Sequence, residues 1–379
     1  MAMMWPEGIT SAGVASGIKT DGSDLGVIVV DRPAVWAGTF TRNASAAACV
    51  HWCRARGSKR VRAIVVNSGN ANACTGEAGV EAVQAVAART AAILGCSPEE
   101  ILIASTGTIG IPLPTDKIIT ALPQALRSTE SDPSSFGFAI MTTDSVKKLS
   151  SAPAGNATVI GVAKGAAMLA PNMATMLAFI ATDAAVSFSD LQSIIQRAVA
   201  SSFDRISVDA CESTNDSVFL LSSGSVPVAT DELQDAVTRV CKDLAEQMVR
   251  DAEGGSKFVR IEVSGAVDEG AAVGLGKAVA ASALWRAAAN GSDPNWGRVL
   301  SALGAHDRSL DISQVTIAVG SETLFERGEP CGSLEAASKA MSGDGFSLSC
   351  VVGRGVGSAE ILSCDLSPEY VMLNAEGTT

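Results

Sequence analysis

The sequence predicts an α+β protein, built as a layered α/β sandwich in two lobes, and three observations lead to this prediction. The chain has 379 residues, which is more than one small domain usually contains. Hydrophobic residues make up 47% of it and charged residues only 18%, so a large core can form. Short apolar runs alternate with helical patterns but without a regular strand–helix–strand rhythm, which favours α+β layers over a doubly wound parallel sheet.

Several short apolar runs have the composition of buried strands. Residues 62–67 (RAIVVN) lead into the turn sequence SGNAN, and residues 101–104 form a similar run before Ser105-Thr-Gly-Thr. Residues 157–163 alternate as a strand does, and residues 175–182 have the pattern of a strand buried on both faces. The final third is predicted to be rich in strands, at residues 314–325 with a turn at Gly320, and at residues 346–352 and 359–366.

Helices are predicted where apolar residues recur with a period near 3.6. One helix is expected over residues 77–94, with Val80, Val83, Ala87 and Leu94 near one face. A second is expected to begin at Ser189, because Ser189-Asp-Leu-Gln192 fits a capping box. The clearest helix starts at Thr230, and its core-facing stripe consists of Leu233, Val237, Val240, Leu244 and Met248.

Two glycine-rich stretches resemble nucleotide-binding loops only superficially. Gly353-Arg-Gly-Val-Gly357 lacks a third glycine at the required spacing, so a tight turn is the better interpretation. Gly274-Leu-Gly-Lys277 is followed by Ala278, where a phosphate loop carries the Ser or Thr that binds magnesium. We therefore expect neither stretch to bind a nucleotide.

Charge and cysteine content limit the classes of partner. The net charge of −12 disfavours nucleic acid and anionic membranes. The most apolar stretch, residues 168–186, is interrupted by polar residues and too short to span a bilayer, and no signal peptide is apparent, so we expect a cytoplasmic protein. Nine scattered cysteines without a Cys-x-x-Cys pair, together with only two histidines, predict neither a disulfide framework nor a metal site.

Acyl chemistry in this chain needs a base other than histidine, because neither His51 nor His306 lies in a recognisable triad motif. A free N-terminal amine can serve, since its pKa of about 7.7–8.0 is close to neutral. In residues 164–180 the small residue Ala174 precedes Thr175, which opens an apolar strand. Attack by the Thr175 hydroxyl on the Ala174 carbonyl would expose such an amine; the alternative is an ordinary buried strand start.

Residues 164–179, KGAAMLAPNMATMLAF, resemble the processing site of the ornithine acetyltransferase family, also called bifunctional glutamate N-acetyltransferase. Further blocks resemble the same family in the expected order along essentially the whole chain: VNSGNANACTGE at 66–77, STGTIG at 105–110, MTTD at 141–144, STND at 213–216, DPNWGR at 293–298 and Leu373-Asn374. The resemblance implies the layered sandwich of that family, which is of the N-terminal-nucleophile type.

The resemblance also implies roles for individual residues. Thr175 would be both the self-cleaving residue and the acyl acceptor, and Thr106 and Gly107 would form the oxyanion hole. The residues implied to bind substrate are Thr143 (with Thr142 as the neighbouring alternative), Lys164, Thr175, Glu253, Asn374 and Thr379. The DPNWGR block has no implied chemical role, and we interpret it as structural support.

The function implied by the resemblance is acetyl transfer from N-acetylornithine to glutamate in arginine biosynthesis, through an acetyl-threonine intermediate. It implies cleavage into residues 1–174 and 175–379, an α2β2 assembly, and neither a metal nor a bound cofactor. An alternative is a bifunctional enzyme that also uses acetyl-CoA as donor. An N-terminal-nucleophile aminopeptidase would carry Ser where Thr175 stands, and an unprocessed binding protein would remain one uncut chain.

Three departures from the family pattern leave substrate range and regulation open. Ala166 and Ala167 follow Gly165, where the family often carries a serine and a glycine. Asp209-Ala-Cys211 stands where Asp-Gly-Asp is usual, and Cys49 replaces an expected proline. None of these changes removes a proposed catalytic group.

Overall fold

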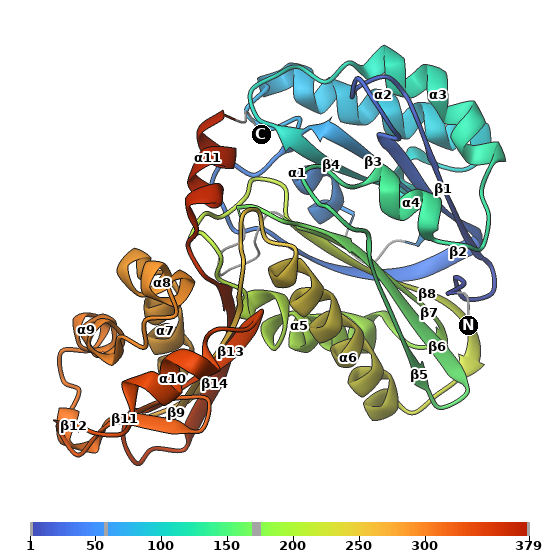
Figure 1. The fold of residues 1–379 in the computed structure, drawn as a ribbon. Helices are drawn as coiled ribbons and strands as arrows, with labels where there is room; N and C mark the ends of the chain where they lie inside the picture. Colours follow the sequence, from blue (N-terminus) through green and yellow to red (C-terminus); the bar gives the residue numbers. More distant parts are fainter. Residues whose placement is uncertain (1–2, 57–59, 169–175, 377–379) are drawn as a thin grey trace.

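The computed structural model describes residues 3–56, 60–168 and 176–376, which form two lobes, each with its own sheet (Figure 1). The first lobe contains an eight-stranded sheet in the order β4-β3-β2-β8-β7-β6-β5, with β1 paired to β2. Its strands are β1 (Ile9–Val14), β2 (Leu25–Phe40), β3 (Val61–Asn70), β4 (Ile101–Thr108), β5 (Lys148–Ala154), β6 (Ala157–Lys164), β7 (Leu177–Ala185) and β8 (Ser217–Pro227). The α+β prediction with two lobes is confirmed.

The long strand β2 divides the first sheet into two halves that pack face to face. Its first part pairs with β1 and β3, the register shifts between Val29 and Ala34, and its last part pairs with β8. Alternate residues of both halves meet in a buried core that includes Ile64, Leu102, Val162, Phe179 and Phe219. Phe179 stacks on Phe219 with ring centroids 5.4 Å apart.

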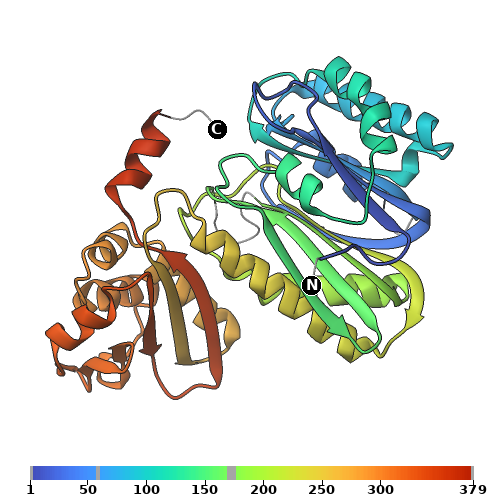
Figure 2. The ribbon, with the colours of Figure 1, turned by 45° about the vertical axis from the view of Figure 1, so that its right-hand side comes forward.

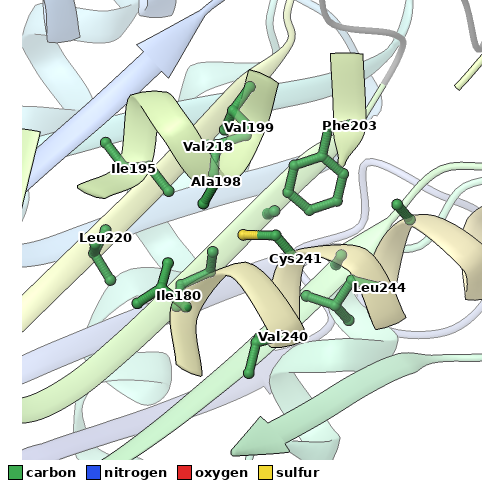
Figure 3. Close-up of a cluster of buried hydrophobic side chains, with 14 of the residues drawn as sticks. Ile180, Ile195, Ala198, Val199, Phe203, Val218, Leu220, Val240, Cys241 and Leu244 are labelled. Atoms are coloured by element: carbon green, nitrogen blue, oxygen red, sulfur yellow. The ribbon is translucent and has the colours of Figure 1, made fainter. Parts of the chain in front are cut away.

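Helices cover the outer face of each half of the sheet, so the lobe has four layers in the order helices, sheet, sheet and helices (Figure 2). The helices of this lobe are α1 (Ala48–Arg54), α2 (Gly76–Leu94), α3 (Thr115–Arg127), α4 (Ser134–Ala139), α5 (Phe188–Ala200) and α6 (Thr230–Arg250). Helices α2 and α3 pack on the half with β3 and β4, while α5 and α6 pack on the half with β6, β7 and β8. Figure 3 shows the second of these contacts, where Val240, Cys241 and Leu244 of α6 face Ile180 and Leu220 of the sheet.

The second lobe contains a six-stranded sheet in the order β12-β11-β10-β13-β9-β14 with helices packed on it. The strands are β9 (Phe258–Ala266), β10 (Thr316–Val319), β11 (Glu322–Glu326), β12 (Glu329–Pro330), β13 (Gly345–Val351) and β14 (Gly357–Cys364). The helices of this part of the chain are α7 (Glu269–Ala280), α8 (Ala283–Asn290), α9 (Trp296–His306), α10 (Leu334–Ala340) and α11 (Pro368–Glu376), which projects from the lobe.

Most of the predicted elements are present, and the stripe of α6 is buried as expected. Four predictions need correction. The turns expected directly after residues 67 and 104 are wrong, because β3 continues to Asn70 and β4 continues to Thr108. Val80 is 45% exposed rather than part of the buried face of α2. The cap of α5 is Ser187, whose hydroxyl accepts the N–H of Asp190, and not Ser189. The final third also contains helices α7 to α11, which the strand-rich prediction missed.

The two glycine-rich stretches have structural roles. Gly274 and Gly276 lie in α7, and a Cβ on Gly276 would lie 2.6 Å from Cγ1 of Ile361, so the glycine lets the helix approach β14 closely. Gly353 to Gly357 connect β13 to β14 in a tight bend, where a Cβ on Gly355 would lie 1.9 Å from the carbonyl oxygen of Ala266.

The predicted cut after residue 174 does not coincide with the boundary between the lobes. Strands β6 and β7 lie on either side of it and pair antiparallel, with Lys164 opposite Leu177. Strands β7 and β8 and helices α5 and α6 thus complete the first lobe. Among the residues that the structure describes, no helix is long and apolar enough to cross a membrane.

Candidate active site

A cavity of about 210 Å³ lies where β3, β4 and β6 end. Its lining brings together five residues predicted for the site: Thr106, Gly107, Thr143, Lys164 and Glu253. The other lining residues are Lys19, Gly69, Thr108, Thr142, Ala167 and Met168. Residues far apart in the sequence therefore share one concave, partly enclosed volume, as is usual for a small-molecule site.

Thr106 and Gly107 lie side by side near the end of β4. Gly107 has a φ of +132°, and a Cβ there would lie 2.3 Å from the carbonyl carbon of Gly69, so only glycine fits. Asn215 holds the neighbouring backbone of β4 and of the residue after β3, because its side-chain amide donates to the carbonyl oxygens of Ser105 (2.8 Å) and Ala71 (2.6 Å). The STND block thus supports the end of β4.

Lys164, at the end of β6, is a buried cation whose neighbours are mainly hydroxyl groups. Its ammonium donates to Oγ1 of Thr142 at 2.6 Å and to Oγ1 of Thr106 at 3.3 Å, while Oδ2 of Asp144 is 3.8 Å away. Burial lowers the pKa of Lys164, and Asp144 opposes this shift. An ammonium this poorly neutralised is suited to binding an anion.

Behind Lys164 lies a buried network of charges formed by Asp144, Lys148 and Asp251. Lys148 is fully buried and donates to Oδ1 of Asp144 (2.7 Å) and Oδ2 of Asp251 (2.5 Å). Asp144 also accepts the N–H groups of Gly165 (2.6 Å) and Thr142 (3.1 Å). Burial by itself would raise the pKa of Asp144, but Lys164 and Lys148 hold it at about 2. The network therefore fixes the backbone at Gly165, directly after Lys164, and at Thr142, whose hydroxyl accepts from Lys164.

Glu253 follows α6 and lines the same cavity. Its backbone N–H donates to the carbonyl oxygen of Ala166 at 2.9 Å, which ties it to the segment after Lys164. Its Oε1 is buried and has no hydrogen-bond partner among the described residues. A buried carboxylate oxygen without a partner is costly, so it is suited to meet a cationic group of a ligand.

The predicted nucleophile Thr175 and its neighbour Ala174 lie outside the described residues, as does Thr379. The next residue, Met176, donates its N–H to Oδ1 of the fully buried Asp216 at 3.0 Å. Burial raises the pKa of Asp216 well above its ordinary value. Asn374 lies on α11, where its amide donates to the carbonyl oxygen of Tyr370 at 2.9 Å, and it does not line the cavity.

The comparison with known families agrees with this site. The model of the ArgJ family matches residues 10–379. The chain belongs to the ArgJ family. The resemblance to the ornithine acetyltransferases is thereby confirmed, and the chain is an acetyltransferase of arginine biosynthesis, with the role of a glutamate acetyltransferase and ornithine transacetylase.

Two relatives and one solved structure show over what part of the chain the similarity extends. The arginine biosynthesis bifunctional protein ArgJ of Thermus thermophilus is 40% identical over 383 residues, covering 100% of both chains. That of Streptomyces coelicolor is 42% identical over 334 residues, covering 86% of this chain and 87% of the relative. The crystal structure of ornithine acetyltransferase complexed with ornithine from Mycobacterium tuberculosis has 38% identity and a TM-score of 0.43, covering 45% of this chain and 94% of that one.

The structure adds site residues to this ArgJ chain that the sequence analysis did not single out. Asp144 belongs to the MTTD block, so the motif was a signal for it, whereas Lys148, Asp251 and Lys19 carried no signal. Lys164 bonds to Thr142, while Thr143 lines the same cavity, so both threonines border the site. Within the described ranges, no three His, Cys, Asp or Glu side chains gather as a metal site.

Proposed function

We propose that the chain cuts itself between Ala174 and Thr175, and that Thr175 then carries an acetyl group from N-acetylornithine to glutamate. The observation that supports this most is the shared cavity of Thr106, Gly107, Lys164 and Glu253. It brings the hydroxyl of Thr106 and the backbone of Gly107, which we propose as the oxyanion hole, together with a cation and a carboxylate, and these are the groups that an acetylated amino acid requires.

In the cleavage step, the Thr175 hydroxyl attacks the carbonyl carbon of Ala174 and its proton passes to the departing nitrogen. The acyl group is then held as an ester on the threonine oxygen. Water hydrolyses this ester, which leaves a carboxylate on Ala174 and a free α-amine on Thr175. The new amine has a pKa suited to proton transfer near neutral pH.

In the transfer step, the Thr175 oxygen attacks the acetyl carbon of N-acetylornithine, and the α-amine takes the hydroxyl proton and passes it to the leaving nitrogen of ornithine. The amine of glutamate then attacks the acetyl-threonine ester and restores the hydroxyl. This two-step exchange through a covalent intermediate is ping-pong chemistry.

Thr106, Lys164 and Glu253 supply the charge complementarity. Because Oγ1 of Thr106 accepts a hydrogen bond from Lys164, its own proton is free to donate to a tetrahedral oxyanion. Lys164 binds the substrate carboxylate, and the unpartnered oxygen of Glu253 meets the substrate amine. The C-terminal residues Asn374 and Thr379 are further proposed contacts.

The test is the intact mass of the purified protein beside two variants. We expect the wild type to separate into residues 1–174 and 175–379, Thr175→Ala to remain one uncut chain, and Thr175→Ser, which keeps a hydroxyl, to be cut at least partly. Complete cleavage of Thr175→Ala would contradict the proposal, as would a processed wild type that does not release ornithine from N-acetylornithine.

A second activity, acetylation of glutamate by acetyl-CoA, is favoured by the word bifunctional in the names of the relatives. Supplying acetyl-CoA and glutamate without N-acetylornithine tests it, and formation of N-acetylglutamate is the expected result. An α2β2 assembly and a cytoplasmic location complete the proposal, and sedimentation of the processed protein tests the assembly.

A further inference from the structure

Lys19 is a third charged residue on the cavity wall, and the mechanism above does not use it. Its half-buried ammonium donates to a neutral group, the carbonyl oxygen of Met141, at 3.1 Å. No ion pair between the residues that the structure describes involves Lys19. A partly buried cation without a carboxylate in direct contact costs free energy, so its position needs an explanation.

The chain around Lys19 is built to hold this side chain over the cavity. Asp24 is fully buried, and its carboxylate accepts the N–H groups of Ser16 (2.5 Å) and Lys19 (2.9 Å), which fixes the loop before β2. Gly69 provides the space, because its φ is +94° and a Cβ there would lie 2.9 Å from Cγ of Lys19. The lysine stem therefore runs over a backbone position that is open only for glycine.

The charges of the described lining residues do not balance. Lys19 and Lys164 are cations, and Glu253 is the single carboxylate among them. Lys19 and Lys164 are close enough to affect each other: burial lowers the pKa of Lys19, and Lys164 lowers it further, against the opposing effects of Asp24 and Asp144. A ligand with two carboxylates and one amine complements this arrangement.

We propose that Lys19 binds the side-chain carboxylate of the acetyl acceptor and so selects a dicarboxylic amino acid. This inference rests on the proposed function, in which Lys164 takes the other carboxylate and Glu253 the amine. The acetyl donor has only one carboxylate, because the side chain of N-acetylornithine ends in an amine. Lys19 is therefore needed in the second half-reaction, in which glutamate takes the acetyl group from Thr175. It is not needed in the first half-reaction, in which N-acetylornithine acetylates Thr175 and ornithine is released.

The experiment compares two acceptors and two half-reactions in Lys19→Met, which keeps the length of the side chain but removes its charge. We expect kcat/KM for glutamate to fall roughly 10- to 100-fold, the usual effect of losing a hydrogen bond to a charged group. With glutamine as acceptor, and in the release of ornithine from N-acetylornithine, we expect little change. The preference for glutamate over glutamine is thus the decisive quantity, since a general structural defect would lower both acceptors together.

Lys117→Met is the matched control. Lys117 is another lysine that holds the same loop, through a hydrogen bond to the carbonyl oxygen of Gly17, but it does not line the cavity. We expect this variant to keep the preference of the wild type, and Lys19→Arg, which retains the charge, to recover part of it. Should Lys19→Met fold poorly, Lys19→Gln provides the same comparison with a polar side chain.

The outcomes separate the two proposals. If the wild type transfers acetyl from N-acetylornithine to glutamate and Lys19→Met keeps the wild-type preference, the inference about Lys19 is overturned while the proposed function stands. An equal loss with glutamate and glutamine would also overturn it. A wild type that performs no transfer would overturn the proposed function itself, and the inference with it.

Discussion

In the first lobe, three buried charged side chains, Asp144, Lys148 and Lys164, lie together at the cavity, and Lys164 forms part of its wall. In the second lobe, the buried charges Arg286 and Asp365 lie away from it. Arg286 donates to the carbonyl oxygens of Cys364 (2.9 Å) and Asp365 (3.0 Å), and Asp365 accepts the N–H group of Lys257 at 2.9 Å.

The two groups of buried charges differ in the groups to which they bind. Those of the second lobe are bonded mainly to backbone groups at the ends of β9 and β14, so they shape loops. Asp144, Lys148 and Lys164 of the first lobe form ion pairs with one another and hold the ammonium of Lys164 at the cavity. Asp24 of the same lobe behaves like the charges of the second lobe, because it accepts backbone N–H groups. Buried charge therefore marks the site only where it is connected to the cavity wall, and the following predictions test this distinction.

The largest effect is expected from Lys148→Met, which leaves the buried carboxylates of Asp144 and Asp251 without their shared cation. We expect the free energy of unfolding to fall by about 3–5 kcal/mol, as measured by urea denaturation. Arg286→Met, which removes hydrogen bonds to carbonyl groups of the second lobe, should cost less, about 1–3 kcal/mol. Equal losses in the two variants would remove the distinction between the lobes.

A smaller effect is expected from acid. The pKa of Asp144 is about 2 in the fold, against an ordinary value of 3.8. Since the folded pKa is the lower one, this carboxylate stabilises the protein above about pH 4 by about 2 kcal/mol, and the contribution is lost as the pH falls toward 2.

Urea denaturation across this pH range measures the contribution, and Asp144→Asn should lack it. Asp183→Asn is the control, because Asp183 accepts the N–H group of Thr158 (2.8 Å) at the far end of β7. This variant should lose stability in acid as the wild type does. An unchanged acid response in Asp144→Asn would show that the network behind Lys164 does not depend on the charge of Asp144.

The smallest effect is expected in the second lobe, at the DPNWGR block. Trp296 stacks on Phe325 with ring centroids 4.9 Å apart, and Asn295 caps α9 by accepting the N–H group of Arg298. Trp296→Leu should lower the stability by about 1 kcal/mol and leave kcat and KM unchanged. A loss of activity without a loss of stability would contradict the interpretation of this block as structural support.

The features that could be predicted from the sequence are those that depend on local patterns of residues. The stripe of α6 and the strands at residues 62–67 and 101–104 follow from periodicity, and the motifs located Thr106, Gly107, Lys164 and Glu253. Helices α7 and α8 escaped prediction because they are rich in Ala and Gly, which give little contrast between buried and exposed faces. Lys19 escaped because its place depends on Asp24 and on the open backbone at Gly69, fifty residues away in the chain.

The antiparallel pairing of β6 with β7 has a consequence for how the protein refolds after cleavage. Because the proposed cut falls between these strands, the two products share one sheet and one core and stay associated without a covalent link. Folding of the precursor is then a unimolecular event, whereas recovery of the cut protein from denaturant requires two chains to meet. After self-cleavage, the first lobe can therefore no longer refold as a single chain. The yield of renatured protein then depends on the protein concentration.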